Sequence, residues 1–256
     1  MKPLILLLAC GLSAAVAAET LIVGIGDQAF PPYKVGNDKL DPRRPGLSVE
    51  LVQAAARSCR LKADIRLLPG VRLLKELESG ALDAVMMLSY TADRAAYAVF
   101  PLQAGKPDEA RRLATLSYSL YIRRDSDVRW DGKKLSNLRR SVGANAGWSI
   151  NTDLQRLGIP AETTNSVAQN FDKLVSKRID AYAVHETLGD AYLANNPALP
   201  VRKLAQPIST KPYFLPLSRH YAASHPRQAE CLWNAIAAQR DDLTRRRIRF
   251  YLDASG

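Results

Sequence analysis

Arg94 is the residue whose type and position in this sequence most clearly suggest ligand chemistry. An apolar run over residues 82–88 ends at Ser89-Tyr90-Thr91, and Arg94 follows at the expected start of a helix. Open α/β sheets bind ligands where their buried strands end. A guanidinium offers a planar fork of N–H groups that matches a carboxylate, and it stays charged. The pattern predicts an anion-binding cleft around Arg94, with a local ion pair to a neighbouring acid as the alternative.

Hydroxyls, aromatic rings and groups at helix starts could complete this cleft. The candidates are Ser89, Thr91, Tyr33, Phe30, Ser149, Gly147, His185 and Glu186. Hydroxyls would donate hydrogen bonds, and aromatic rings would form pocket walls. Ser149 and the amides near Gly147 precede a helix, where an anion can be held. Ser149 as a simple helix cap, and the aromatic residues as core residues, are the alternatives.

The overall composition is that of an ordinary globular protein with a basic surface. The chain has 256 residues, 47% of them apolar, and a formal net charge of +11. Its basic pairs are scattered among acidic residues, and the arginines at residues 245–249 fit a solvated helix end. We therefore expect no nucleic-acid partner. The sequence also contains no cluster of metal ligands, and no cofactor is expected.

Residues 1–18 are typical of a cleaved signal peptide. Lys2 precedes an apolar segment at residues 4–9, and small residues at 15–18 suit cleavage after Ala18. The segment is too short to span a membrane, so the mature chain is expected in the periplasm. A lipoprotein site at Cys10 is the weaker alternative, because the apolar stretch before it is very short.

Export also affects how the cysteines are interpreted. Removal of Cys10 leaves Cys59 and Cys231, an even pair in an oxidising compartment. A disulfide between a helix end in the first half and the C-terminal helix is one hypothesis. Two buried free thiols are the other.

A repeated segment indicates two lobes of similar design. Residues 77–84 and 174–181 share the pattern L-x-S-x-x-h-D-A, where h is apolar, and each is expected to join a helix to a buried strand. Both follow the order strand, helix, strand, helix. We predict an α/β fold with lobe 1 at residues 19–118 and 213–256, and lobe 2 at residues 119–212. Runs at residues 117–123 and 212–217 would be the strands that cross between the lobes.

These segments together resemble the periplasmic solute-binding proteins of family 3, the amino-acid-type receptors of ABC importers. The similarity covers the mature chain. It is carried by Pro31-Pro32-Tyr33 and by residues 46–51, 80–84, 89–94 and 179–181. The resemblance implies two lobes that close on a ligand by a hinge, with Arg94 behind Thr91 holding the ligand carboxylate. It also implies the membrane subunits of an ABC importer as partners of a monomeric receptor.

The chain departs from this family where an acid would bind a ligand ammonium group. Five positions after Asp180 stands His185, and Glu186 follows it. An imidazole cannot replace a carboxylate facing a cation. Either Glu186 supplies the charge, or the ligand is not a standard amino acid. Met86-Met87, in place of small hydroxyl residues, also points to a less polar ligand.

The sequence thus predicts a non-enzymatic protein that captures a small carboxylate-bearing solute, such as an amino acid or a derivative, for an ABC importer. One alternative is a periplasmic enzyme similar to the cyclohexadienyl dehydratases, in which His185-Glu186 would act beside Arg94. Another is a sensory protein that presents its ligand to a membrane receptor.

Overall fold

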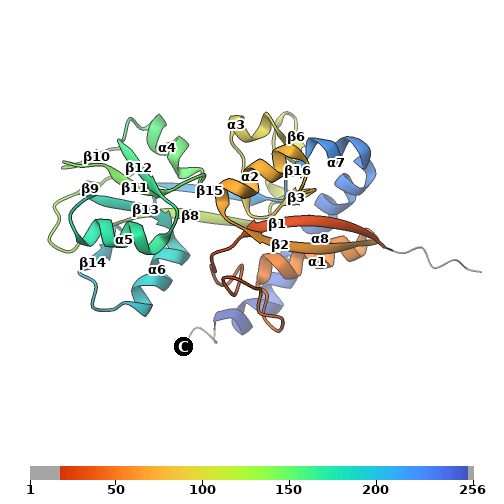
Figure 1. The fold of residues 1–256 in the computed structure, drawn as a ribbon, viewed down its shortest axis with the longest axis horizontal. Helices are drawn as coiled ribbons and strands as arrows, with labels where there is room; N and C mark the ends of the chain where they lie inside the picture. Colours follow the sequence, from red (N-terminus) through yellow and green to blue (C-terminus); the bar gives the residue numbers. More distant parts are fainter. Residues whose placement is uncertain (1–17, 253–256) are drawn as a thin grey trace, which may run out of the picture.

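The computed structural model describes residues 18–252, which form two lobes side by side joined by two long strands (Figure 1). Apart from Ala18, the expected signal peptide lies outside the described residues. No helix between residues 18 and 252 combines the length and the apolar character that crossing a membrane requires.

Lobe 1 is built on a five-stranded sheet with the order β2-β1-β3-β16-β5. Its strands are β1 (Glu19–Gly26), β2 (Leu61–Leu68), β3 (Ala84–Val85), β5 (Ala98–Val99) and β16 (Leu217–Ser218). Helices α1 (Leu47–Ser58) and α8 (Pro226–Leu252) share a core with Leu21, Val23 and Ile25 of β1. Ile22, between them, packs on the other face with the apolar side of α2 (Gly70–Ser79). The alternation along β1 therefore buries both faces of the sheet.

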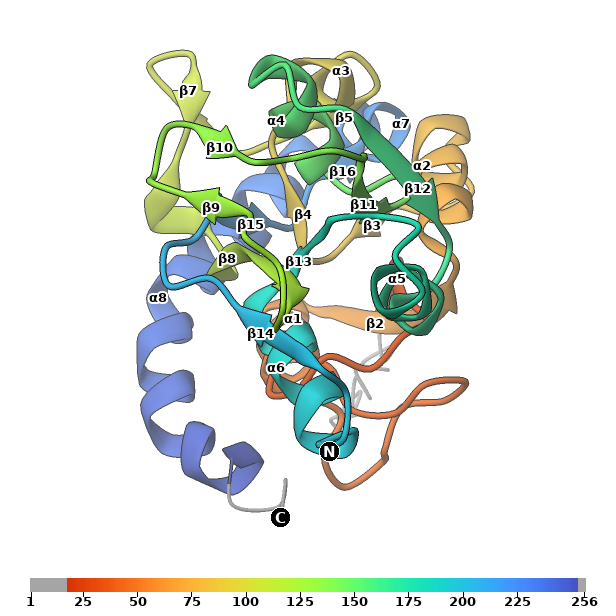
Figure 2. The same cartoon turned by 90° about the vertical axis from the view of Figure 1, so that its left-hand side faces the viewer.

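Lobe 2 is built on a sheet with the order β12-β11-β13-β8-β15-β4, to which β14 adds by pairing with β8. Its strands are β4 (Leu88–Ser89), β8 (Ala114–Arg123), β11 (Val142–Asn145), β12 (Ala161–Thr164), β13 (Ala181–His185), β14 (Val201–Lys203) and β15 (Ser209–Phe214). Its helices are α4 (Ile150–Arg156), α5 (Val167–Val175) and α6 (Glu186–Asn195). Figure 2, in which lobe 2 faces the viewer, shows α5 and α6 close to β13 and β14. The antiparallel strands β8 and β15 are the ones that cross between the lobes (Figure 1).

The shorter elements connect these layers. They are α3 (Ala92–Ala95), the 3-10 turn η1 (Glu109–Arg111), α7 (Arg219–Ser224), and the strand pairs β6 (Leu102–Gln103) with β7 (Lys106–Pro107) and β9 (Arg129–Trp130) with β10 (Leu135–Ser136).

The two lobes repeat one local design. The parallel strand orders β2-β1-β3 and β12-β11-β13 are equivalent, since the first strand of each lobe lies between the second and the third. The aspartate of each repeated segment has an equivalent role as well. Asp83 Oδ2 accepts a hydrogen bond from the backbone N–H of Ile22 at 2.7 Å, and Asp180 Oδ2 accepts from Arg139 and Arg140 at 2.6 Å. Each carboxylate thus fastens the helix–strand junction to the first strand of its lobe, or to the residues just before it.

Two apolar runs that the sequence predicts as continuous strands are each divided. Residues 82–88 form the two-residue strands β3 and β4, which belong to different sheets, because Met87 has a left-handed backbone with φ of 62°. Residues 212–217 are likewise shared between β15 and β16, with Pro216, which has no N–H to donate, immediately before β16. Both divisions occur where the chain passes from one sheet to the other.

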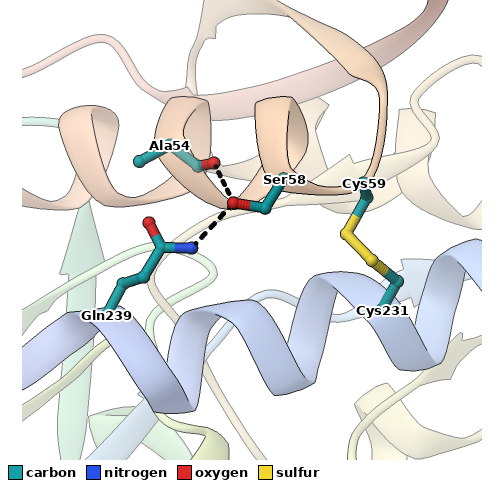
Figure 3. The surroundings of a disulfide bond; sticks show 5 residues. All are labelled: Ala54, Ser58, Cys59, Cys231 and Gln239. Atoms are coloured by element: carbon teal, nitrogen blue, oxygen red, sulfur yellow. Dashed lines mark hydrogen bonds between the residues drawn. A yellow bond between two sulfur atoms is a disulfide. The ribbon is translucent and has the colours of Figure 1, made fainter.

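A disulfide between Cys59 and Cys231 joins the end of α1 to α8, with a Cα–Cα distance of 5.9 Å (Figure 3). Of the two alternatives for this pair, the structure therefore has the bond rather than two free thiols. A second contact lies beside it: Ser58 Oγ accepts a hydrogen bond from Gln239 Nε2 at 3.0 Å and donates to the carbonyl of Ala54 at 3.2 Å (Figure 3). The C-terminal helix is thus fixed covalently to lobe 1.

Substitution of Gly189 by alanine is expected to destabilise lobe 2. A Cβ at this position would lie 2.2 Å from Cζ of Tyr121, whose hydroxyl donates to Asp190 at 2.7 Å. Forcing the ring away should cost about 1–3 kcal/mol, which exceeds the gain of about 1 kcal/mol in helix propensity. Urea unfolding would measure the change. Gly26→Ala is the matched control, since nothing lies within 4 Å of its added Cβ; equal effects of the two substitutions would contradict the steric argument.

Candidate functional site

A cleft of about 790 Å³ lies between the lobes and takes residues from both. Lobe 1 contributes the segment after β1 and the first turns of α2, including Asp27, Phe30, Arg72 and Lys75, together with Met86, Met87 and Arg94. Lobe 2 and the crossing strands contribute Tyr118, Gly147, Trp148, Ser149, His185 and Tyr213. The cleft thus follows the carboxyl ends of β1 and β13, where an α/β sheet is expected to hold a ligand.

Arg94 spans the junction of the lobes. Its side chain is buried, and Nη1 donates to the carbonyl of Ser89 at 2.8 Å and to Ser89 Oγ at 3.0 Å. Nη2 donates to the carbonyl of Gly147, in lobe 2, at 2.8 Å. Thr91 caps α3 by accepting from the backbone N–H of Arg94 at 3.2 Å. No carboxylate among residues 18–252 forms an ion pair with Arg94, so the alternative of a local ion pair is wrong.

These contacts leave part of the guanidinium available. Nε–H and one N–H of Nη2 have no hydrogen-bond partner among the described residues, out of the five N–H groups that an arginine carries. A buried cation without an anionic partner is costly. An incoming carboxylate would supply the missing charge.

Neutral hydroxyls surround the cleft side of Arg94. Tyr118 and Tyr213 are buried, and burial raises the pKa of both phenols, so both remain protonated. Ser149 is also buried close to them, although its Oγ makes no well-directed hydrogen bond among the described residues. Its hydroxyl does not cap α4. Ser149 is therefore placed to donate to a ligand, and the helix-cap alternative is wrong.

His185 forms the centre of an aromatic cluster at the base of the cleft. Its ring centroid lies 4.0 Å from that of Tyr118, 5.1 Å from that of Trp148 and 6.2 Å from that of Phe30. The hydroxyl of Tyr213 lies 3.2 Å from Nε2. Burial lowers the pKa of His185 to about 3. A hydrogen bond with the backbone of Ser117 raises the pKa, but its effect is smaller. The imidazole is therefore neutral at physiological pH.

The buried neutral state of His185 predicts a pH dependence of stability. The folded pKa of about 3 lies below the ordinary value of 6.5, so acid protonates the unfolded chain first. The stabilising effect is complete above about pH 6.5 and declines as the pH falls toward 3. Between pH 6.5 and 5 the wild type should lose about 2 kcal/mol more than His185→Gln, at about 1.4 kcal/mol for each pH unit. Urea unfolding at both pH values tests this; equal losses would mean that His185 is protonated in the folded protein.

Lys211 provides a second cation behind the cleft. On β15, its Nζ lies 2.5 Å from Asp153 Oδ2 and 3.2 Å from the carbonyl of Ser149. Burial lowers the pKa of Lys211, while the Asp153 carboxylate acts in the opposite direction. The charges of Lys211 and Arg94 also contribute to the low pKa of His185. Both cations therefore disfavour protonation of His185 at the base of the cleft.

Phe30 lines the cleft, and Tyr33 stands behind it, with a ring-centroid distance of 5.7 Å. The loop that carries both is held by Lys34, which is fully buried. The ammonium group of Lys34 donates to the carbonyls of Asp27 and Gly36 at 2.6 Å and of Asn37 at 3.2 Å. This lysine fixes the wall of the site, although its sequence environment gives no sign of that role.

Glu186 lies outside the cleft. Its carboxylate is 2.5 Å from Lys203 Nζ, and its backbone carbonyl accepts from Tyr121 Oη at 3.0 Å. Asp27 is the only acidic residue that lines the cleft within residues 18–252. Five of the candidates from the sequence line the cleft: Phe30, Arg94, Gly147, Ser149 and His185. Ser89 and Thr91 contact Arg94 instead. Tyr33 lies behind Phe30, and Glu186 faces away from the cleft.

Comparisons with known proteins support the architecture at the level of structure. No protein-family model and no curated protein sequence matches the chain. An ancestral arginine-binding protein bound to glutamine is 21% identical, with a TM-score of 0.68, over 90% of this chain and 96% of that chain. A histidine kinase sensor domain with similarity to periplasmic binding proteins is also 21% identical, with a TM-score of 0.67, over 87% and 96%. The substrate-binding protein of an amino acid ABC transporter is 18% identical, with a TM-score of 0.65, over 88% and 97%.

At these identities the comparisons establish the fold alone. The two sheets, the crossing strands β8 and β15, and the cleft between the lobes agree with that result. The chain has the two-lobed α/β fold of the periplasmic binding proteins.

Proposed function

We propose that this protein is a periplasmic solute-binding protein that captures a small carboxylate-bearing solute in the cleft and delivers it to an ABC importer. The observation that carries the proposal is Arg94, a buried guanidinium at the junction of the lobes that forms no ion pair with an acid among residues 18–252. A binding site for an anion explains why such a costly group is retained.

The surroundings of Arg94 fit this role. The hydroxyl of Ser149 and the unpartnered N–H groups of Arg94 would bind the ligand oxygens, and the aromatic cluster around His185 would cover the rest of the molecule. A pocket with apolar walls and a few convergent polar groups is typical of small-molecule sites. Among the lining residues within 18–252, no serine, threonine or cysteine is hydrogen-bonded to His185, which favours binding over turnover.

The remaining parts of the proposal have separate support. The names of the structural neighbours include an arginine-binding protein and a receptor of an amino acid ABC transporter, which favours import as the purpose of capture. The sequence of residues 1–18 favours export to the periplasm, and a disulfide between Cys59 and Cys231 suits that oxidising compartment.

Mass spectrometry of the small molecules released from freshly purified protein tests the central claim. We expect a carboxylate-bearing compound, and a thermal-shift screen of amino acids, polyamines and organic acids should show the same class raising the melting temperature. Absence of any bound or stabilising compound would reject the proposal. Each hit should also be assayed for turnover, since conversion of the compound would favour the dehydratase-type enzyme.

Deletion of the gene separates import from sensing. Loss of uptake of the identified solute is expected if the protein serves an importer. Unchanged uptake would favour a sensory role.

A further inference from the structure

We infer that the solute of this cleft is an organic carboxylate with an apolar body, aromatic by preference, and without an ammonium group. This inference rests on the proposed function and names the class of compound that the same site would accept.

The charges around the cleft oppose an ammonium group. Arg72, Lys75 and Arg94 line the cleft, whereas Asp27 is the only acidic lining residue within the described part of the chain. Arg72 is paired with Glu76, and Lys211, behind the base, is paired with Asp153, so Lys75 and Arg94 carry the positive charge that no ion pair balances among the described residues. A ligand ammonium transferred from water into this region would lose its hydration and gain no nearby carboxylate.

Asp27 does not change this balance. It stands on the segment that follows β1, and the buried ammonium of Lys34 is bonded to its backbone carbonyl at 2.6 Å. The Asp27 carboxylate also acts on Lys34 electrostatically, raising its pKa against the larger effect of burial. The charge of Asp27 is therefore partly balanced by the buried ammonium of Lys34.

The base of the cleft offers rings where a charged partner would be needed. His185 is buried among Tyr118, Trp148, Phe30 and Tyr213, and its Nε2 is occupied by the hydroxyl of Tyr213. A flat apolar group can stack on such a surface, since aromatic rings favour offset-stacked or edge-to-face contacts. Met86, Met87 and Leu74 extend the apolar wall. The volume of about 790 Å³ is sufficient for a ring-bearing acid.

Matched pairs of compounds that differ only in the α-amino group test the inference. Suitable pairs are 3-phenylpropanoate with phenylalanine, 3-indolepropanoate with tryptophan, and 4-methylpentanoate with leucine, measured by calorimetry at pH 7. In every pair that binds, we expect the compound without the amino group to bind at least about tenfold more tightly, and the aromatic acids more tightly than the aliphatic one. Glycine betaine and 2-phenylethylamine, which test the rings as a cation site, should not bind.

An amino acid that binds as tightly as its partner, or binding of either the zwitterion glycine betaine or the cation 2-phenylethylamine, would overturn the inference and leave the proposed function intact. It is also overturned if no pair binds while another class of solute does. If no compound of any kind binds or is released from the protein, the proposed function itself fails.

A substitution at His185 supplies an independent test. His185→Asp would place an acid at the base of the cleft, and we expect it to shift the preference toward the amino acid of each pair by at least about tenfold. His185→Asn is the control, because asparagine has nearly the same shape as aspartate but carries no charge. If the folded Asp variant keeps the wild-type preference, His185 does not face the position of the amino group and the inference is wrong. Should that variant fail to fold, the wild-type measurements still decide.

Discussion

Replacement of Arg94 by alanine is expected to weaken the binding of any carboxylate ligand by about 30-fold or more, since loss of one member of a buried charge pair costs about 2–5 kcal/mol. The guanidinium is buried and is held by the carbonyls of Ser89 and Gly147, with no carboxylate in an ion pair with it among residues 18–252. Arg94→Lys should also lose most of the affinity, because an ammonium cannot reproduce the planar fork. Calorimetric titration with the ligand identified by mass spectrometry gives the comparison.

Arg72→Ala is the matched control for this experiment. Arg72 lines the same cleft, but its side chain is 66% exposed and is paired with Glu76 at 2.6 Å. Its removal should change the affinity by less than about threefold, because exposed charges contribute little. An Arg94→Ala variant that behaves like Arg72→Ala would disprove the central role of Arg94.

Removal of the disulfide is expected to cause the largest loss of stability. The bond between Cys59 and Cys231 closes a loop across a sequence separation of 172 residues, for which the chain-entropy estimate is about 5 kcal/mol. The double substitution Cys59→Ser/Cys231→Ser should therefore lower the melting temperature by roughly 10–20 °C, at about 2–4 °C for each kcal/mol. Differential scanning calorimetry without reductant measures the difference.

Gln239→Ala provides the corresponding control. It removes the hydrogen bond to Ser58, near the disulfide, without breaking the covalent link. We expect a loss of no more than about 1 kcal/mol, the usual net value of one hydrogen bond. A reductant should destabilise the wild type and leave the double variant unchanged. Equal melting temperatures for wild type and double variant would show that the bond adds no stability.

The two-lobed fold could be predicted because its signals are local. The repeated segments at residues 77–84 and 174–181 show their periodicity without reference to the rest of the chain, and both aspartates fulfil the same backbone role. The division of residues 82–88 between two sheets could not be predicted in this way. Their apolar pattern is continuous, and the turn at Met87 lies where the chain passes from one sheet to the other. A left-handed conformation at methionine has no signature in the sequence.

The candidate site could be predicted where a residue follows a strand end. Arg94 and His185 were found by that rule. Tyr118 and Tyr213 were missed because they lie within the crossing strands, and only the pairing of β8 with β15 determines which side chains face the cleft. Glu186 illustrates the same limit. Strand β13 ends at His185, and Glu186 is the first residue of α6. The chain changes direction between the two residues, so the Glu186 carboxylate points toward Lys203.

The pairing of β8 with β15 also has a consequence for modularity. Ser117 lies opposite Thr210, with their hydroxyl oxygens 2.8 Å apart, so the chain enters and leaves lobe 2 at adjacent positions. A domain whose two ends lie close together can be exchanged without moving apart the segments of the domain into which it is inserted. Lobe 2 can therefore be replaced as a unit. The second lobe of another receptor, joined at Ser117 and Thr210, would lie opposite Arg94 on an unchanged lobe 1.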